Sequence, residues 1–141
     1  MSYGLRPLVR LEAEDGLLDR WGTVEQRATV RAGEDNSALS EYTVFASNEI
    51  NKFLSAARAN LSGDQWQLKR KDGPGLLTVT SVNGLLVLFR HYVRLKGLSS
   101  FDQYKFDLAK LNTFDFAAYK SSRYFAMGTG LYTLLFGSEP A

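Results

Sequence analysis

Hydrophobic and polar residues alternate in several short segments of the chain, a period of two that is typical of half-exposed β-strands. The alternation is clearest over residues 23–31, where Val24, Ala28 and Val30 fall on one face and charged or hydroxyl side chains on the other. On the same grounds, further strands are predicted over residues 4–12, 66–72, 76–82 and 85–96, with a shorter one over 41–45.

Two turn signals connect the three strands predicted between residues 66 and 96. The segment Asp-Gly-Pro-Gly at 72–75 combines residues that favour reverse turns. Asn83-Gly84 is typical of a two-residue type I′ hairpin, because both positions of that turn need a positive φ. The sequence therefore predicts an antiparallel β-meander over residues 66–96.

Helical periodicity replaces strand alternation in two parts of the chain. Residues 47–61 place Ile50, Phe53, Leu54 and Ala57 on one face, with Ser47 as N-cap. After the meander, Ser100 and Gln103 fit a capping box, and two helices are predicted over 101–111 and 114–127. Gly128-Thr129-Gly130 is interpreted as the stop of the second helix, and residues 131–136 fit a strand or a helical turn.

These elements predict an α+β fold in a single domain, residues 1–141. It contains an antiparallel sheet of about five strands, one helix in the first half and two helices after the sheet. Strands followed by two C-terminal helices resemble the element order of small RNA-phage coat proteins, although the helix over 47–61 departs from that order. The resemblance implies a self-assembling viral or phage structural protein.

Composition limits the chemistry that the chain can carry. It has no cysteine and one histidine, His91, which removes disulfides, thiolate nucleophiles and cysteine-based metal sites. Strand alternation places His91 on the core side, as a hydrogen-bonded histidine at the core edge. No signal peptide and no transmembrane run are found, so we expect a soluble protein of the cytoplasm or a virion, with no membrane partner, cofactor or metal.

Carboxylates are the remaining option for an enzyme. Glu12 and Glu14 share one predicted strand face, and three aspartates follow one another in the last third, Asp102, Asp107 and Asp115. Paired carboxylates hydrolyse glycosides only at a defined separation, and nothing in the sequence brings any two of these together. A small hydrolase is therefore kept as an alternative to a non-enzymatic protein.

Charge is distributed unevenly along the chain, whose net charge is only +2. Residues 12–49 contain nine acidic and three basic residues, a net charge of −6. Residues 66–96 contain six basic residues and one acidic residue, a net charge of +5. An acidic first half and a basic meander indicate that function depends on electrostatic contacts.

Strand alternation gathers the basic residues of the meander on one sheet face. The predicted site consists of Lys69, Lys71, Arg90, Tyr92, Arg94 and Lys96. Cations repeating at about 7 Å along a strand, with an aromatic ring between them, fit a nucleic-acid backbone and a stacked base. The sequence therefore predicts a nucleic-acid-binding module, with RNA or another single strand favoured.

A protein partner competes with nucleic acid for the same surface. The acidic surface of one copy could dock on the basic sheet of the next, which predicts a homo-oligomer. The two hypotheses are compatible, because a coat-like subunit needs both lateral contacts and a basic inner face.

Overall fold

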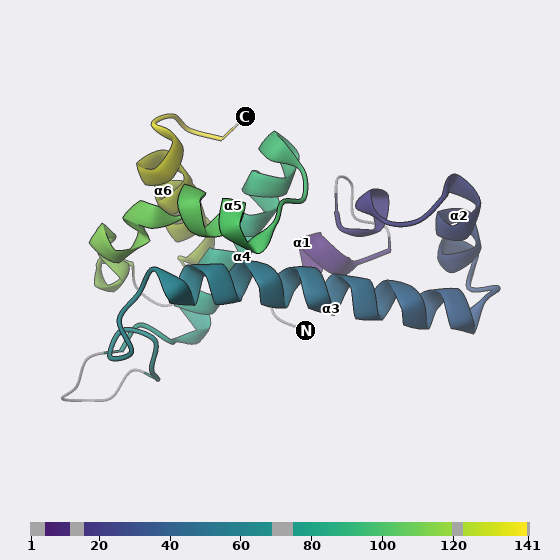
Figure 1. Ribbon diagram of the computed structural model, residues 1–141, viewed down its shortest axis with the longest axis horizontal. Coiled ribbons are helices and arrows are strands. Elements are labelled where there is room, and N and C mark those ends of the chain that lie inside the picture. Colours follow the sequence, from purple (N-terminus) through teal and green to yellow (C-terminus); the bar gives the residue numbers. More distant parts are fainter. Residues whose placement is uncertain (1–4, 12–15, 69–74, 120–122, 141) are drawn as a thin grey trace.

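The computed structural model describes residues 5–11, 16–68, 75–119 and 123–140, and these residues form helices and loops (Figure 1). Within these ranges there is no strand; Leu68 and Leu77 form one isolated parallel bridge. The helices, in chain order, are α1 (Arg6–Val9), η1 (Leu18–Arg20), α2 (Val24–Ala32), α3 (Asn36–Ala59), α4 (Val79–Lys96), α5 (Phe101–Asp107), η2 (Ala109–Thr113), η3 (Phe116–Ala118) and α6 (Tyr124–Phe136). The predicted α+β fold is therefore wrong, and the described chain is all-helical.

The alternating segment at 23–31 is helix α2. Its start is fixed by a capping box, in which the Thr23 side chain accepts from the Gln26 amide and the Gln26 side chain accepts from the Thr23 amide. Two donors that a helix start leaves free are satisfied in this way. The described part of the strand predicted over 4–12 contains α1, and the strand predicted over 41–45 lies inside α3.

The predicted meander is also wrong. Residues 79–96 form the single helix α4, with Thr78 as its N-cap accepting from the Ser81 amide. Asn83-Gly84 lies inside this helix and makes no hairpin. The turn predicted at 72–75 lies almost wholly outside the described residues. Without the sheet, the resemblance to RNA-phage coat proteins has no structural basis.

Two helix predictions are confirmed with different bounds, and the helix predicted over 114–127 is wrong over most of its described length. Only the 3-10 turn η3 lies within residues 114–119, and α6 begins at Tyr124. The helix predicted over 101–111 ends at Asp107, and η2 follows it. The helix predicted over 47–61 exists but begins earlier, after the N-cap Asp35. Ser100 caps α5 by accepting from the Gln103 amide, as predicted. Gly128-Thr129-Gly130 does not stop a helix: it lies within α6, which ends at Gly137, a residue with φ of 76°.

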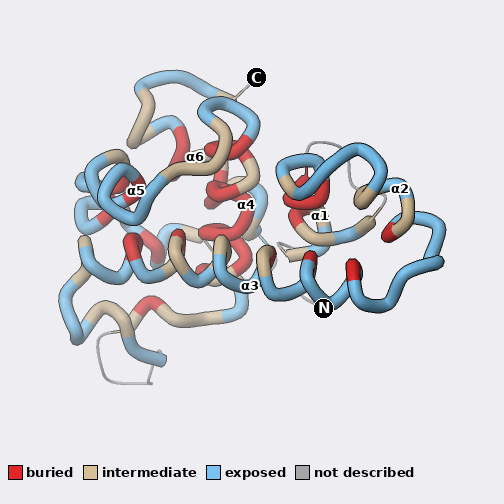
Figure 2. Tube along the Cα trace, turned by 45° about the vertical axis from the view of Figure 1, so that its right-hand side comes forward, coloured by how far each residue is buried: buried red, intermediate tan, exposed pale blue. Residues whose placement is uncertain are grey.

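Helix α3 is 24 residues long and joins two parts of the molecule (Figure 1). Its first half packs against α2, and its second half packs against α5. Tyr42, in the first half, donates a hydrogen bond to the Val9 carbonyl at the end of α1. Phe53, in the second half, is fully buried; its ring stacks on Phe89 of α4 at 4.4 Å and meets Tyr104 of α5 at 5.4 Å. Buried residues concentrate in α4 and its neighbours, whereas α2 is mostly exposed (Figure 2).

Helices α4 and α6 approach each other closely because glycines lie in their interface. A Cβ atom on Gly84 would lie 2.5 Å from Sδ of Met127, and one on Gly128 would clash with Val87. The absence of side chains at both positions lets the two backbones approach. This contact, with those of α1 and of Phe53 in α3, buries almost the whole circumference of α4 between Asn83 and Val93.

Candidate functional site

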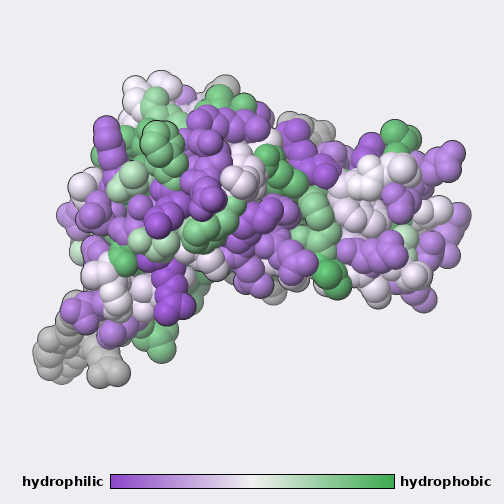
Figure 3. All heavy atoms as spheres, viewed as in Figure 1, coloured by the Kyte–Doolittle hydropathy of each residue, from purple (hydrophilic) through white to green (hydrophobic). Residues whose placement is uncertain are grey.

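A groove lined by both apolar and charged side chains lies between the C-terminal ends of α4 and α6 and the end of α5. Its volume is about 370 Å³, and its lining residues are Lys96, Phe106, Asp107, Ala109, Lys110, Leu135 and Phe136. We call it the C-terminal groove. Phe106 forms one wall and is 76% exposed, although it is a large aromatic side chain. Hydrophobic surface is visible in Figure 3 over α6, in the upper left of the view, between hydrophilic side chains.

A hydrogen-bond network fixes the inner side of the groove. The Tyr92 hydroxyl donates to Asp107 at 2.6 Å, and Lys96 Nζ and Gln103 Nε2 donate to the same carboxylate at 3.2 and 3.1 Å. Burial acts to raise the pKa of Asp107, but these three hydrogen bonds outweigh burial and hold that pKa below its usual value. Burial and the bond to Asp107 raise the pKa of Tyr92.

The lysines at the groove differ in their ionic contacts and in their exposure to solvent. Lys96 Nζ pairs with Asp107 and lies 5.4 Å from the centroid of the Phe136 ring, so this charge is partly compensated. Lys110 is exposed at the rim, and Lys105 is exposed on the neighbouring turn of α5. The groove therefore combines an apolar floor with a positive rim.

The opposite end of the molecule is acidic. We call residues 23–48, which comprise α2 and the first half of α3, the arm; its tip is the connection between these helices (Figure 1). Four exposed acidic residues belong to it: Glu25, Glu34, Asp35 and Glu41. Val24 and Val44 are also exposed on the arm, at 73% and 61%. Val44 follows Glu41 by one helical turn, so an acidic and an apolar side chain share one face of α3.

This polarity extends to the whole sequence. Residues 1–49 contain five basic and nine acidic residues, a net charge of −4, and residues 50–141 contain twelve basic and six acidic residues, a net charge of +6. Within the described chain, the arm contains four acidic and two basic residues, a net charge of −2.

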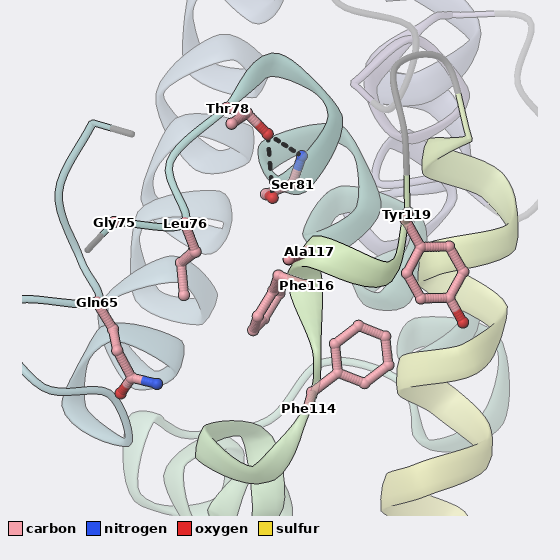
Figure 4. A pocket seen from close by; sticks show the side chains of 9 residues that line it. All are labelled: Gln65, Gly75, Leu76, Thr78, Ser81, Phe114, Phe116, Ala117 and Tyr119. Carbon is pink, nitrogen blue, oxygen red and sulfur yellow. Dashed lines mark hydrogen bonds between the residues drawn. The ribbon is translucent and has the colours of Figure 1, made fainter. Parts of the chain in front are cut away.

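A second cavity, of about 240 Å³, lies between the start of α4 and η3 (Figure 4). It is lined by Gln65, Gly75, Leu76, Thr78, Ser81, Phe114, Phe116, Ala117 and Tyr119. We call it the η3 cavity. Phe114 packs edge-to-face on Phe116, with centroids 5.0 Å apart, and stacks on Tyr119 at 5.6 Å.

The residues predicted to form a basic sheet face are separated by the helix. Arg90 and Arg94 lie one turn apart on one side of α4, and Lys96 lies on the other side with Tyr92. Tyr92 is fully buried, so its ring is not available to stack on a base. Lys69 and Lys71 lie outside the described residues. The strand geometry that would align these six residues is absent from the described chain.

His91 lies in the interface between α4 and α6 and is 7% exposed. Its ring meets those of Phe125 and Tyr132 at centroid distances of 6.0 and 5.8 Å, and Nε2 has no hydrogen-bond partner among the described residues. The predicted core position is therefore correct, but no hydrogen bond to Nε2 is found. Burial and the charges of Arg90 and Arg94 lower the pKa of His91.

The candidate carboxylates do not gather in the described part of the chain. Asp102 is exposed, Asp115 accepts from the Ala117 amide at the start of η3, and Asp107 belongs to the groove network. Glu12 and Glu14 lie outside the described residues. Among the residues that the structure describes, no group of three His, Cys, Asp or Glu side chains is placed to hold a metal ion.

The sequence prediction missed the groove, although one signal pointed to it. In the helix predicted over 101–111, Phe101, Tyr104, Leu108 and Leu111 follow helical spacing, and Phe106 falls outside that pattern. A large aromatic residue away from the buried face of a helix is expected to be exposed, as Phe106 is.

Over the described residues, these features define a helical protein with a partly apolar, positively rimmed groove at one end and an acidic arm at the other. The chain matches no model of a known protein family, and no curated protein or solved structure was found to be similar to it. None of the described helices combines the length and apolar character needed to cross a membrane.

Proposed function

We propose that this protein is a non-enzymatic assembly subunit whose copies bind head to tail, with the acidic arm of one copy in the C-terminal groove of the next. The observation that carries the proposal is Phe106, a 76% exposed aromatic side chain on the wall of a groove with lysines at its rim. Aromatic residues, Phe among them, are enriched in the buried core of protein interfaces.

Charge complementarity selects the arm of a second copy as the occupant. The groove presents Lys110 at its rim, with Lys105 nearby, and the arm presents Glu41 beside Val44. Opposite charges at the edge of an interface steer the encounter and fix its orientation. In the proposed contact, the Val44 side chain of one copy packs on Leu135 and Phe136 in the groove of the next.

The two surfaces are different, so the contact between two copies is heterologous. Each bound pair keeps one free arm and one free groove, and further copies can add until a ring closes or a filament grows. A two-fold contact between identical surfaces would instead stop at a dimer.

Two variants separate the surfaces. Val44→Asp places a charge on the arm, and Phe106→Asp places one in the groove; both side chains are exposed, so folding is expected to persist. By sedimentation velocity, each variant alone is expected to be monomeric. An equimolar mixture is expected to form a 1:1 dimer that does not grow, because only one intact arm and one intact groove remain.

Val79→Asp is the matched control. Val79 is 78% exposed and belongs to neither the arm nor the groove, so this variant should assemble as the wild type does. A wild-type chain that stays monomeric at low salt, or variants that assemble normally, would overturn the proposal.

Nucleic-acid binding stays a prediction, and sedimentation with added RNA tests it separately. Arg90 and Arg94, one turn apart on α4, are the pair whose neutralisation would weaken binding to a single-stranded RNA. If the wild type sediments together with the RNA and neutralisation of Arg90 and Arg94 abolishes the complex, the basic half of the protein binds nucleic acid. If the wild type forms no complex with the RNA, it does not.

A further inference from the structure

We infer that the η3 cavity binds a neutral, planar ring compound that carries a hydrogen-bonding group, such as an aromatic amide. This inference is independent of assembly, because the cavity shares no lining residue with the C-terminal groove. It rests on the shape of the cavity walls, on the polar groups among them and on the absence of charged side chains from the described residues that line it.

The apolar walls fit a flat ligand. Phe116 points towards Leu76 across the cavity, and Phe114 lies between Phe116 and Tyr119 (Figure 4). Phe116 and Leu76 are 9% and 8% exposed, so packing holds these two walls in place. Aromatic faces and edges held in this way favour another aromatic ring, which stacks or packs edge-to-face on them.

Polar groups are present on two sides of the cavity. The Thr78 hydroxyl donates to Ser81 Oγ at 3.1 Å and accepts from the Ser81 amide, which fixes both hydroxyls at the start of α4 (Figure 4). Gln65 Oε1 accepts from the Ser62 amide, which orients the side chain and leaves its NH₂ group as a donor. A ligand with one donor and one acceptor can bind between these groups.

Among the described residues that line the cavity, none has a charged side chain. A charged ligand would lose hydration on entering and gain no countercharge from these residues, so a neutral compound is favoured. The volume of about 240 Å³ equals roughly eight waters at their volume in the liquid. This space suits one substituted ring.

Three probes of nearly equal size test the inference on the full chain. Benzamide is planar and neutral, benzoate is planar and charged, and cyclohexanecarboxamide is neutral but not planar. In NMR titrations, benzamide is expected to shift the signals of Phe114, Phe116 and Tyr119 saturably, with a Kd of about 1 mM. The other two probes are expected to bind at least about tenfold more weakly, because each lacks one property that the walls select.

Two neighbouring alanines provide a matched pair of variants. Ala117 lines the cavity and is exposed, so Ala117→Phe fills the cavity without removing a core side chain. Ala118 is exposed and is not among the lining residues, so Ala118→Phe is the control. Ala117→Phe is expected to abolish benzamide binding, and Ala118→Phe to leave it unchanged.

Three results would overturn the inference. They are the absence of saturable shifts at about ten times the expected Kd, equal binding of benzamide and benzoate, and undiminished binding to an Ala117→Phe variant whose circular dichroism matches the wild type. None of these results bears on head-to-tail assembly, which is measured by sedimentation.

Discussion

Tyr92 joins several parts of the structure through one side chain. Its hydroxyl binds Asp107 of α5 and lies 3.1 Å from Ser99 Oγ, and its ring contacts Phe53 of α3 and Phe136 of α6. The side chain is fully buried, so it acts inside the protein and not at its surface. At the scale of single residues, the buried phenol and the buried imidazole of His91 are the groups whose replacement is most informative.

Tyr92→Phe is expected to lower the free energy of unfolding by about 1–3 kcal/mol, because Asp107 loses a buried donor. The pKa of Asp107 should rise, since the hydrogen bond from Tyr92 helps to hold it low. Urea denaturation measures the first effect and NMR titration of the carboxyl carbon the second. Tyr119→Phe is the control, because the Tyr119 hydroxyl makes no hydrogen bond within the described residues. An unchanged pKa of Asp107 would contradict this interpretation.

His91 is expected to make stability depend on pH. Its pKa is lowered in the folded protein, so folding favours the neutral ring. Its stabilising effect is fully present above the unfolded pKa of about 6.5 and is lost as pH falls from there through the folded pKa. Arg90 and Arg94 face the ring from its own helix, and Phe125 and Tyr132 face it from α6.

The measurement is the free energy of unfolding at about pH 7.5 and at a series of lower pH values that spans the unfolded pKa of histidine, about 6.5. The wild type should lose stability on acidification, and His91→Gln should lose less. Equal pH dependence in the two proteins would show that His91 does not titrate with unfolding.

At the scale of elements, the contact between α4 and α6 depends on glycine. Gly84 and Gly128 leave no side chain between the two helices, and Met127 and Val87 occupy the space so created. The hairpin predicted at Asn83-Gly84 also required Gly84, but because that turn needs a positive φ. In the helix its φ is ordinary, and what Gly84 provides is room for Met127.

Gly84→Ala therefore tests two opposing effects. Alanine is favoured over glycine in a helix by roughly 0.5–1 kcal/mol, but its Cβ would lie 2.5 Å from Met127 Sδ. We expect a net loss of about 1–3 kcal/mol, because overpacking a close interface costs more than helix propensity gains. Thermal and urea unfolding measure the change.

Gly63→Ala is the control, since nothing lies within 4 Å of a Cβ at that position. In the double variant Gly84→Ala/Met127→Ala, the closest contact, to Met127 Sδ, is removed and only the one to Cβ at 3.2 Å remains, so the loss should be smaller than the sum of the two single losses. Strictly additive losses would show that the two residues do not compete for the same space.

At the scale of the whole molecule, the two parts of the sequence differ in net charge, and the arm, with a net charge of −2, belongs to the acidic part. Residues 1–49 carry a net charge of −4 and residues 50–141 one of +6, although the total is only +2. The arm includes the first half of α3, whereas the groove is formed by α4, α5, η2 and α6, near the other end of α3 (Figure 1). Copies arranged head to tail bring the opposite charges together.

Self-association is therefore expected to weaken as salt is added. Screening shortens the Debye length from about 10 Å at 0.1 M to about 3 Å at 1 M, which reduces the attraction between exposed charges. Sedimentation equilibrium over this range measures the effect. The apolar contact of Phe106 should leave some association at high salt. Association that strengthens with salt would indicate an apolar contact without the proposed charge pairing.

Several features could be predicted from the sequence because they depend on neighbours along the chain. The spacing of Phe53 and Ala57 indicates one face of a helix, and both residues are buried. Ser100 caps α5 by binding an amide three residues away, a contact that needs no tertiary structure. The capping box of Thr23 and Gln26 is equally local, and it indicates the start of a helix where the alternation predicts a strand over 23–31.

Helix α4 shows what only the tertiary structure decided. The run Leu85–Phe89 is apolar at every position, so its pattern fits a buried strand as well as a buried helix. A strand needs neighbouring strands to satisfy its backbone, whereas a helix satisfies its own. Here α6 packs closely through Gly84 and Gly128, and α3 covers another side through Phe53. The sequence by itself determined which residues are apolar and how charge is divided, because both are properties of single residues. The tertiary structure decided the α4 helix, and with it the separation of Arg90 from Lys96 and the burial of Tyr92, because packing on all sides depends on residues far apart in the chain.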